Sequence, residues 1–327
     1  MPGLTQFPLT TALAALLPLA LAAGLDLPLT LLLIGSAASL GFQSELPGEL
    51  GDLAVAPVLA MAGLFWLFEF WAERRWLSAL GWNLAQGLVR PLASALLALL
   101  FIPDAGAPWR YGAAIVAALI ALWTQATRTG WRLLLDLAKA RRPSRILVSA
   151  AEDATALALV ALLLDTPQAA TGLSVVIIGL GVAWARPSVR AYSFGIRLVW
   201  GGTWGILTPR RWSEPKRFPG WVGRALSSNG LAPSSELRGT PAGALAHPDL
   251  EVFHGGWVVV RGDSPVFLYR RGLSTRSVDL GAGQAIRVAR AHLHNRLELL
   301  DQHGRTYALC FPWDGPGVER IEAELLV

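Results

Sequence analysis

The stretch LFWLFEFWAERRW, residues 64–76, ends a long apolar segment with one acid inside it and a basic turn after it. Glu69 has seven aromatic or aliphatic neighbours there, and Arg74 and Arg75 follow. About 20 apolar residues in an α-helix are enough to cross about 30 Å of hydrocarbon. The pattern therefore predicts a membrane-spanning helix over residues 53–72.

Similar apolar segments recur along the first two thirds of the chain. The chain has 327 residues, 53% of them hydrophobic and 16% charged, and its first 42 residues contain one charged side chain, Asp26. A secretory signal peptide at the start is disfavoured, because no basic region precedes it and more apolar segments follow. We predict seven spans, at residues 4–23, 25–42, 53–72, 87–102, 111–127, 146–164 and 169–186.

Basic residues gather on alternate connections between these spans, as cytoplasmic loops require. Seven spans then place the N-terminus outside the membrane and the C-terminus in the cytoplasm. Basic residues in cytoplasmic loops explain the formal charge of +5, so nucleic-acid binding is not needed to account for it. The basic residues counted are Arg74, Arg75, Arg90, Arg128, Arg132, Lys139, Arg141, Arg142, Arg145, Arg186, Arg190 and Arg197.

Two of the predicted spans contain helix-breaking signals. Asp26 and Pro28 stand at the start of the second span, and Arg90-Pro91 opens a short fourth span. Proline removes a backbone donor and kinks a helix. Two interpretations stay open: broken or re-entrant half-helices covered by protein or water, or ordinary helices whose polar ends reach the interface.

Two amphipathic segments suggest helices that lie in the cytoplasmic interface. In residues 71–88, leucines recur at helical spacing among several tryptophans. Residues 188–207 are a second candidate, with Arg190 and Arg197 on one side.

The C-terminal third has a different pattern. Residues 208–250 are rich in Pro, Ser, Gly and Ala and predict a linker. From residue 251, runs such as WVVVRG and TYALCF alternate with period two and predict short strands, and WDGPGVERIEAELL predicts a capped final helix. This pattern resembles a pleckstrin-homology-like barrel. We therefore expect a membrane all-α bundle of about seven transmembrane helices, some short or broken, over residues 1–207, and a small mainly-β cytoplasmic domain with a terminal helix over 251–327, able to fold alone.

Several motifs of the apolar part resemble those of a known family. They are LALAAGL, FEFWAERRW, VRPLASALLALL, LAKARRPSR and SAAEDATALALVALLL. Over roughly residues 10–200 the chain resembles a bacterial family of multi-pass membrane proteins catalogued only as a domain of unknown function. The resemblance implies a Glu at the end of the third span, an Arg-Pro that opens the next span and a Glu-Asp pair in a later helix. Here these positions are Glu69, Arg90-Pro91 and Glu152-Asp153. It supplies no activity, and this chain departs from the family pattern at Asp26, where the family usually shows Arg, and in the turn after residue 72.

Four charged residues form a candidate polar cluster at the cytoplasmic side of the predicted bundle: Glu69, Arg90, Glu152 and Asp153. Acids inside a membrane often mark ion or proton pathways. The structural alternative is an ion pair, and for Glu69 we expect pairing with an arginine. Both interpretations stay open for the Glu152-Asp153 pair.

The positions of cysteine and histidine exclude several kinds of chemistry. Cys310 is the single cysteine, and all five histidines lie beyond residue 246. The apolar part therefore has no Ser-His or Cys-His nucleophile and no histidine ligand, and we expect no metal and no cofactor. The function favoured is a non-catalytic accessory or scaffold subunit, with the lipid bilayer and other membrane subunits as partners. The alternative is a small-ion or solute transporter that uses the intramembrane acids and helix breaks at Pro28 and Pro91.

Overall fold

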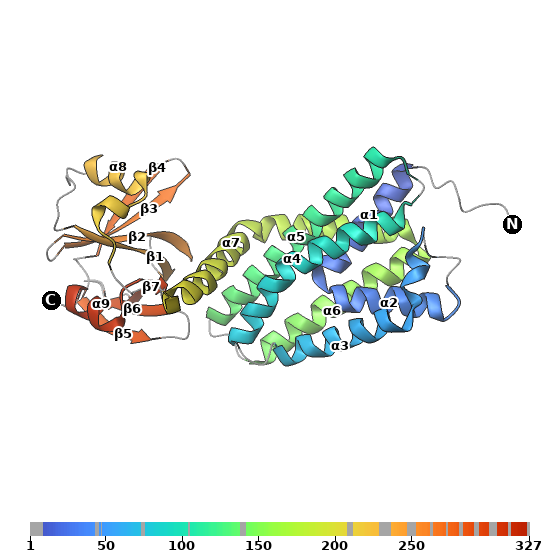
Figure 1. Ribbon diagram of the computed structural model, residues 1–327, viewed down its shortest axis with the longest axis horizontal. Helices are drawn as coiled ribbons and strands as arrows, with labels where there is room; N and C mark the ends of the chain where they lie inside the picture. Colours follow the sequence, from blue (N-terminus) through green and yellow to red (C-terminus); the bar gives the residue numbers. More distant parts are fainter. Residues whose placement is uncertain are drawn as a thin grey trace. The chain divides into compact units, whose positions relative to one another are not determined.

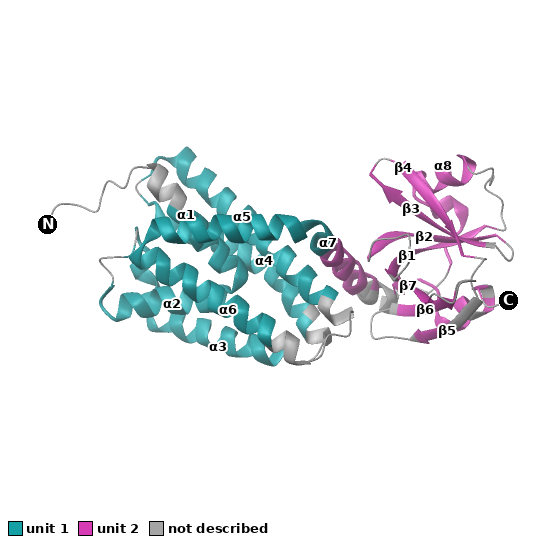
Figure 2. Cartoon of the chain, turned by 180° about the vertical axis from the view of Figure 1, so that it is seen from behind, with its two compact units in different colours: residues 1–189 teal, residues 190–327 magenta. Residues whose placement is uncertain are grey.

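The computed structural model divides the chain into two compact units, residues 1–189 and residues 190–327 (Figure 2). Each unit is described by itself. The structure describes residues 9–325 apart from gaps at 43–45, 47, 73–75, 104, 138–141, 208–211, 229–236, 247–252, 262–263, 273, 281–283, 291–293, 301–305 and 313–314.

The first unit is a bundle of helices (Figure 1). Each predicted span overlaps one helix, although several of the helices are longer than the spans. The helices are α1 (Leu9–Leu25), α2 (Leu27–Ser39), α3 (Ala56–Ala72), α4 (Trp76–Phe101), α5 (Ala107–Leu137), α6 (Arg142–Asp165) and the first part of α7 (Pro167–Leu207), with a short 3-10 helix, η2 (Leu50–Ala54), before α3.

Helix α1 lies at the centre of this bundle, in contact with α2, α4, α5 and α6. Its residues from Leu19 to Ala23 are almost completely buried. The outer helix α3 is the opposite case, because Leu64, Leu67 and Trp71 are exposed. Large apolar side chains on the outside are what a bundle surrounded by lipid needs.

Membrane-type helices are therefore present in the described part of the chain. Three segments are long and apolar enough to cross a membrane: Gly81–Phe101, Leu147–Asp165 and Pro167–Gly201. Shorter apolar helices occupy Ala15–Leu25, Leu27–Ser39 and Ala56–Ala72.

The chain breaks at Asp26 but continues through Pro91. Asp26 is the N-cap of α2, where its carboxylate accepts a hydrogen bond from the Leu29 amide at 3.0 Å, and Pro28 stands in the first turn, where no amide is needed. The predicted break at Pro91 is wrong, since α4 runs through it as one helix of 26 residues. Proline removes only one intrahelical bond there, and packing of α4 against α1 and α5 holds the helix together.

The two predicted interfacial helices are parts of longer helices. Residues 76–88 form the first half of α4, and residues 188–207 form the end of α7. In α4 the polar side chains of Asn83, Gln86 and Arg90 are buried, whereas Leu88 is exposed. The amphipathic pattern of α4 therefore reflects a polar face turned into the bundle.

The second unit contains one antiparallel sheet of seven strands in the order β4-β3-β2-β1-β7-β6-β5. Its inner face, with Val258, Phe267 and Phe311, packs together with Ile321 of the C-terminal helix α9 (Val318–Leu325). A further helix, α8 (Gly220–Ser228), covers Val259 and Leu268 on the other face. A β-rich domain with a final helix is consistent with a pleckstrin-homology-like fold. The strands are β1 (Arg238–Ala246), β2 (His254–Arg261), β3 (Ser264–Arg271), β4 (Ser274–Asp279), β5 (Gln284–Arg290), β6 (His294–Leu300) and β7 (Thr306–Pro312).

The range predicted as a linker, 208–250, contains α8 and β1, so the predicted domain boundary at residue 251 differs from the structure. Strand β1 pairs with both β2 and β7 and joins the two halves of the sheet. Its sequence, RGTPAGALA, has no Val, Ile or aromatic residue and contains Pro241, so it lacks the usual strand signals. Gly243 is needed there, because a Cβ would lie 2.5 Å from the ring of Phe194.

The end of α7 belongs to this second unit. Ala191, Phe194 and Leu198 are buried along one side of the helix. The ring of Phe194 packs on that of Phe253, with 4.9 Å between the centroids. The sheet unit therefore includes the last turns of α7 as part of its packing.

Candidate functional site in the helical bundle

Arg90 of α4 is completely buried, and its acceptors lie on α1, on α3 and on α4 itself, where its Nε donates to Gln86 at 3.4 Å. Its Nη2 donates to both carboxylate oxygens of Glu69 on α3, each at 3.2 Å. Its Nη1 donates to the carbonyl of Gly24 at 2.9 Å and to that of Leu25. These carbonyls end α1, where a cation also favours the helix dipole. Arg90 thus ties α3 and α4 to the end of the central helix.

Arg128 of α5 connects two glutamates. Its Nη2 donates to Glu69 at 2.6 Å, and its Nε donates to Glu152 of α6 at 2.7 Å. The third nitrogen, Nη1, donates to the Asn83 amide oxygen at 3.3 Å. All three guanidinium nitrogens therefore have partners, on α3, α4 and α6. The planar guanidinium suits this arrangement, since it presents its donors in a fixed fork.

Arg132 adds a second cation on Glu152, one helical turn after Arg128. Its Nε donates to Glu152 at 3.2 Å, and its Nη2 contacts both Glu152 and Ser149. The side chains of Glu152 and Arg132 are 12% and 15% exposed, against 0% for Arg90. The network is therefore completely buried at Arg90 and partly exposed at Arg132.

Neutral polar groups support this network at α4 and α5. The Gln125 amide donates to the backbone carbonyl of Asn83 at 2.8 Å and to the Thr129 hydroxyl at 3.1 Å. Gln125 is completely buried. The backbone of Asn83 is thereby fixed while its side chain binds Arg128, so α4 and α5 are held in register.

Two further carboxyl groups lie beside the network. They are Asp26, which is 2% exposed at the start of α2, and Asp153 of α6, which follows Glu152 in the chain. Among the described residues, this cluster therefore has three arginines and four carboxyl groups, those of Glu69, Glu152, Asp26 and Asp153.

Three of the four predicted cluster residues, Glu69, Arg90 and Glu152, lie in one network, and Asp153 lies beside it with Asp26. Arg90 does not contact Glu152 directly, because Arg128 stands between the two glutamates. Of the predicted helix breaks, Asp26 and Pro28 begin α2, and Pro91 lies within α4. Within the described residues, no group of three His, Cys, Asp or Glu side chains is placed to hold a metal ion.

Sequence reasoning missed Arg128 and Arg132 as network residues, because it counted them as cytoplasmic loop charges. Their position on α5 was detectable. Polar residues recur there at Thr124, Gln125, Arg128, Thr129 and Arg132, which is the spacing of one helix face. Such a stripe on an otherwise apolar helix indicates a buried polar surface.

A family model described as "Domain of unknown function (DUF4126)" matches residues 13–186, which is more than half of the chain. The chain belongs to this family. The matched range contains all of the charged residues described above. Within the family match, the network is therefore the part of the structure with the most distinctive chemistry.

Two other comparisons add no function. No curated protein matches the chain. Among solved structures, the chain is similar to one described as "Crystal Structure of an N-terminally Truncated Linker-DH/PH Domains of p115-RhoGEF", at 14% identity, with 84% of this chain and 72% of that chain covered and a TM-score of 0.19. A likeness at that score carries no argument about fold or activity.

Proposed function

We propose that the chain is a non-catalytic scaffold or accessory subunit of a larger membrane protein assembly. The observation that supports this proposal is that the glutamates and arginines of the charge network are paired with one another. Glu69 and Glu152 are both held by arginines, and each nitrogen of Arg90 and of Arg128 has an acceptor. A carboxylate fixed by two arginines is poorly suited to binding and releasing an ion, whereas it is well suited to locking helices together.

The proposed location is a bacterial inner membrane, with the N-terminus outside and the sheet unit in the cytoplasm. The basic segments around residues 74–75 and 139–145 favour this orientation. Arg90, Arg128 and Arg132 no longer support it as loop charges, because they lie inside helices. A C-terminal reporter that is active only in the periplasm would contradict the orientation.

Purification from native membranes without crosslinking tests the scaffold proposal. A scaffold is expected to come out with other membrane subunits in fixed stoichiometry. Arg128→Gln should reduce the amount of these partners recovered, because it loosens the helices that present the outer surface. A chain that comes out alone and monodisperse from gentle detergent would contradict the proposal.

A small-ion or proton transporter is the second candidate. The observation in its favour is the presence of two further acids beside the network, Asp26 at the break between α1 and α2 and Asp153 on α6. Flux through purified chain in liposomes, abolished by Asp153→Asn, would favour this function over the scaffold.

A further inference from the structure

We propose that the outward side of the last part of α7 lies in the headgroup layer of the membrane and holds the sheet unit at the membrane surface. The lipid-facing residues are Val189, Ile196 and Trp200. This inference rests on the membrane location of the chain and is independent of the scaffold proposal.

Helix α7 is longer than one crossing of the bilayer requires. The segment Pro167–Gly201 has 35 residues, and an 18-residue window within it has a mean hydropathy of 1.6. At about 1.5 Å per residue it extends about 52 Å, whereas the hydrocarbon core of a bilayer is about 30 Å thick. About 15 residues therefore exceed a single crossing, and most of them, from Arg190 onward, fall in the part of α7 that belongs to the sheet unit.

One side of this excess helix is already covered by protein. Ala191, Phe194 and Leu198 are buried at intervals of three and four residues. The contacts of Phe194 with Phe253 and with Gly243 show that the sheet unit covers this side.

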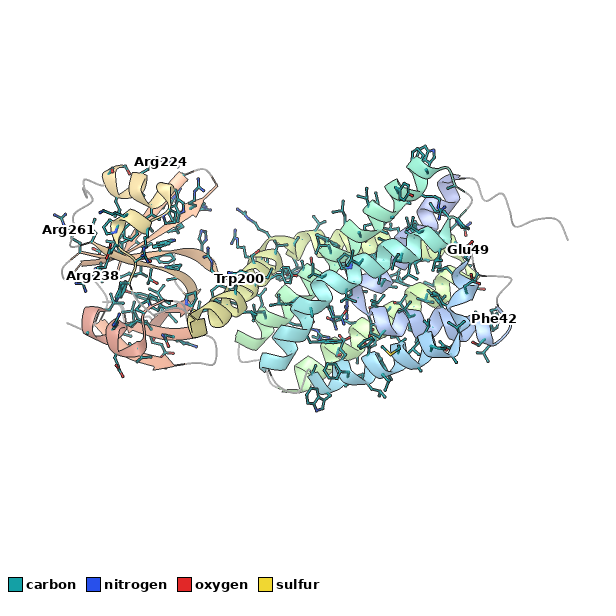
Figure 3. The ribbon with its side chains drawn as sticks, viewed as in Figure 1. Phe42, Glu49, Trp200, Arg224, Arg238 and Arg261 are labelled. Carbon is teal, nitrogen blue, oxygen red and sulfur yellow. The ribbon has the colours of Figure 1, made fainter. Side chains whose placement is uncertain are left out.

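The other side carries large exposed apolar groups. Val189 is 41% exposed, Ile196 is 44% exposed and Trp200 is 64% exposed. Figure 3 labels Trp200 on this helix. Val175 and Val182 are also exposed and precede Val189 at the same seven-residue interval. The apolar stripe of the spanning part of α7 thus continues along the helix into its last turns, which favours lipid as the occupant.

The residue types fit the headgroup layer better than the hydrocarbon core. Tryptophan concentrates at membrane interfaces, where its ring is partly apolar and its N–H can reach polar groups. Arg186 is exposed on the same helix and can reach lipid phosphates. A helix with exposed apolar groups beside an arginine is typical of segments that lie in an anionic membrane surface.

Site-directed labelling of the full-length chain in lipid nanodiscs with anionic lipid tests this proposal. Cys310→Ala provides a background without cysteine, and Val189→Cys and Ile196→Cys each accept one environment-sensitive fluorophore. Leu119→Cys, on an exposed position in the middle of α5, is the reference for lipid, and Thr275→Cys, on the exposed strand β4, is the reference for water.

The labels at 189 and 196 should emit at shorter wavelength than the label at 275. They should be quenched by nitroxide lipids labelled near the headgroup and protected from aqueous iodide. Iodide quenching equal to that at 275 would overturn the proposal, because the stripe would then face water. Protection from both quenchers would also overturn it, because protein would then cover the stripe. If one of the two variants fails to fold, the other still decides between these results.

Discussion

Glu69 on α3 and Arg128 on α5 form an ion pair of 2.6 Å across 59 residues of sequence, and both side chains are almost fully buried. Arg128 also binds Glu152, so one guanidinium joins three helices. This arrangement makes the charges of the bundle interdependent. Removing one group leaves its partners buried without compensation, which is the condition under which a buried charge costs the most.

Replacing Glu69 by Gln should destabilise the bundle. Arg90 would keep its carbonyl acceptors but lose its counter-ion. We expect a loss of about 2 kcal/mol, between the ~0.6 kcal/mol average of polar contacts in membranes and the 3–5 kcal/mol of a broken buried pair. Thermal unfolding in detergent measures the effect. The matched control is Glu49→Gln, an exposed carboxylate (Figure 3), which should leave the melting temperature unchanged. Equal melting temperatures for the two variants would contradict the structural role of Glu69.

Arg128→Lys should destabilise the bundle although it keeps the charge. A lysine ammonium cannot reproduce the three directed contacts to Glu69, Glu152 and Asn83, so at least one buried acceptor loses its partner, at a cost of about 1–3 kcal/mol. Arg276→Lys on β4 is the control, because that side chain is exposed. A melting temperature for Arg128→Lys as high as that of the control would show that charge alone is enough.

Gly24→Ala should push α1 away from α5. An added Cβ would lie 2.8 Å from the Cβ of Thr124 and 2.9 Å from the Cα of Ala121. Overpacking of this kind costs about 1–3 kcal/mol. The shift would also move the Gly24 carbonyl from Arg90. Gly112→Ala on α5 is the control, because no atom lies within 4 Å of its added Cβ. A Gly24→Ala protein as stable as the control would contradict the close approach of the two helices.

Contrary to the expectation from the sequence, the fragment 251–327 should not fold on its own, because it lacks β1, the strand between β2 and β7. A fragment 212–327, which restores β1 and α8, should give the circular dichroism of a folded sheet in the absence of detergent. Cooperative thermal unfolding of 251–327, with the same spectrum as the longer fragment, would show that β1 is dispensable.

Cys310 should be unreactive in the folded chain. Its side chain is fully buried in β7, and burial raises the pKa of the thiol well above its ordinary value of 9.0. The reactive thiolate is therefore scarce at neutral pH. Raising the pH to the ordinary pKa of a thiol should still not produce much thiolate at Cys310. Maleimide labelling before and after denaturation measures this directly. Rapid labelling of the native chain at pH 7 would contradict the packing of β7.

The helices were predictable because each depends on a local run of apolar residues, and the acid in the opening stretch pointed to an arginine partner. Arg128 was missed because its charge has the same local appearance in a cytoplasmic loop and in a buried helix face. The strand β1 was missed for a different reason. Its small residues suit the packing against Phe194 and the neighbouring strands, and that requirement arises only in the folded domain.

The central claim is that the charge network holds the helices of the bundle together and carries no protons or cations across the membrane. The most direct test is the flux of protons and monovalent cations through purified wild-type chain in liposomes, recorded together with Glu152→Gln at a matched protein-to-lipid ratio. Our account predicts no flux above that of empty liposomes for either protein, and a lower melting temperature for Glu152→Gln. Flux in the wild type that Glu152→Gln abolishes, with the melting temperature unchanged, would contradict it.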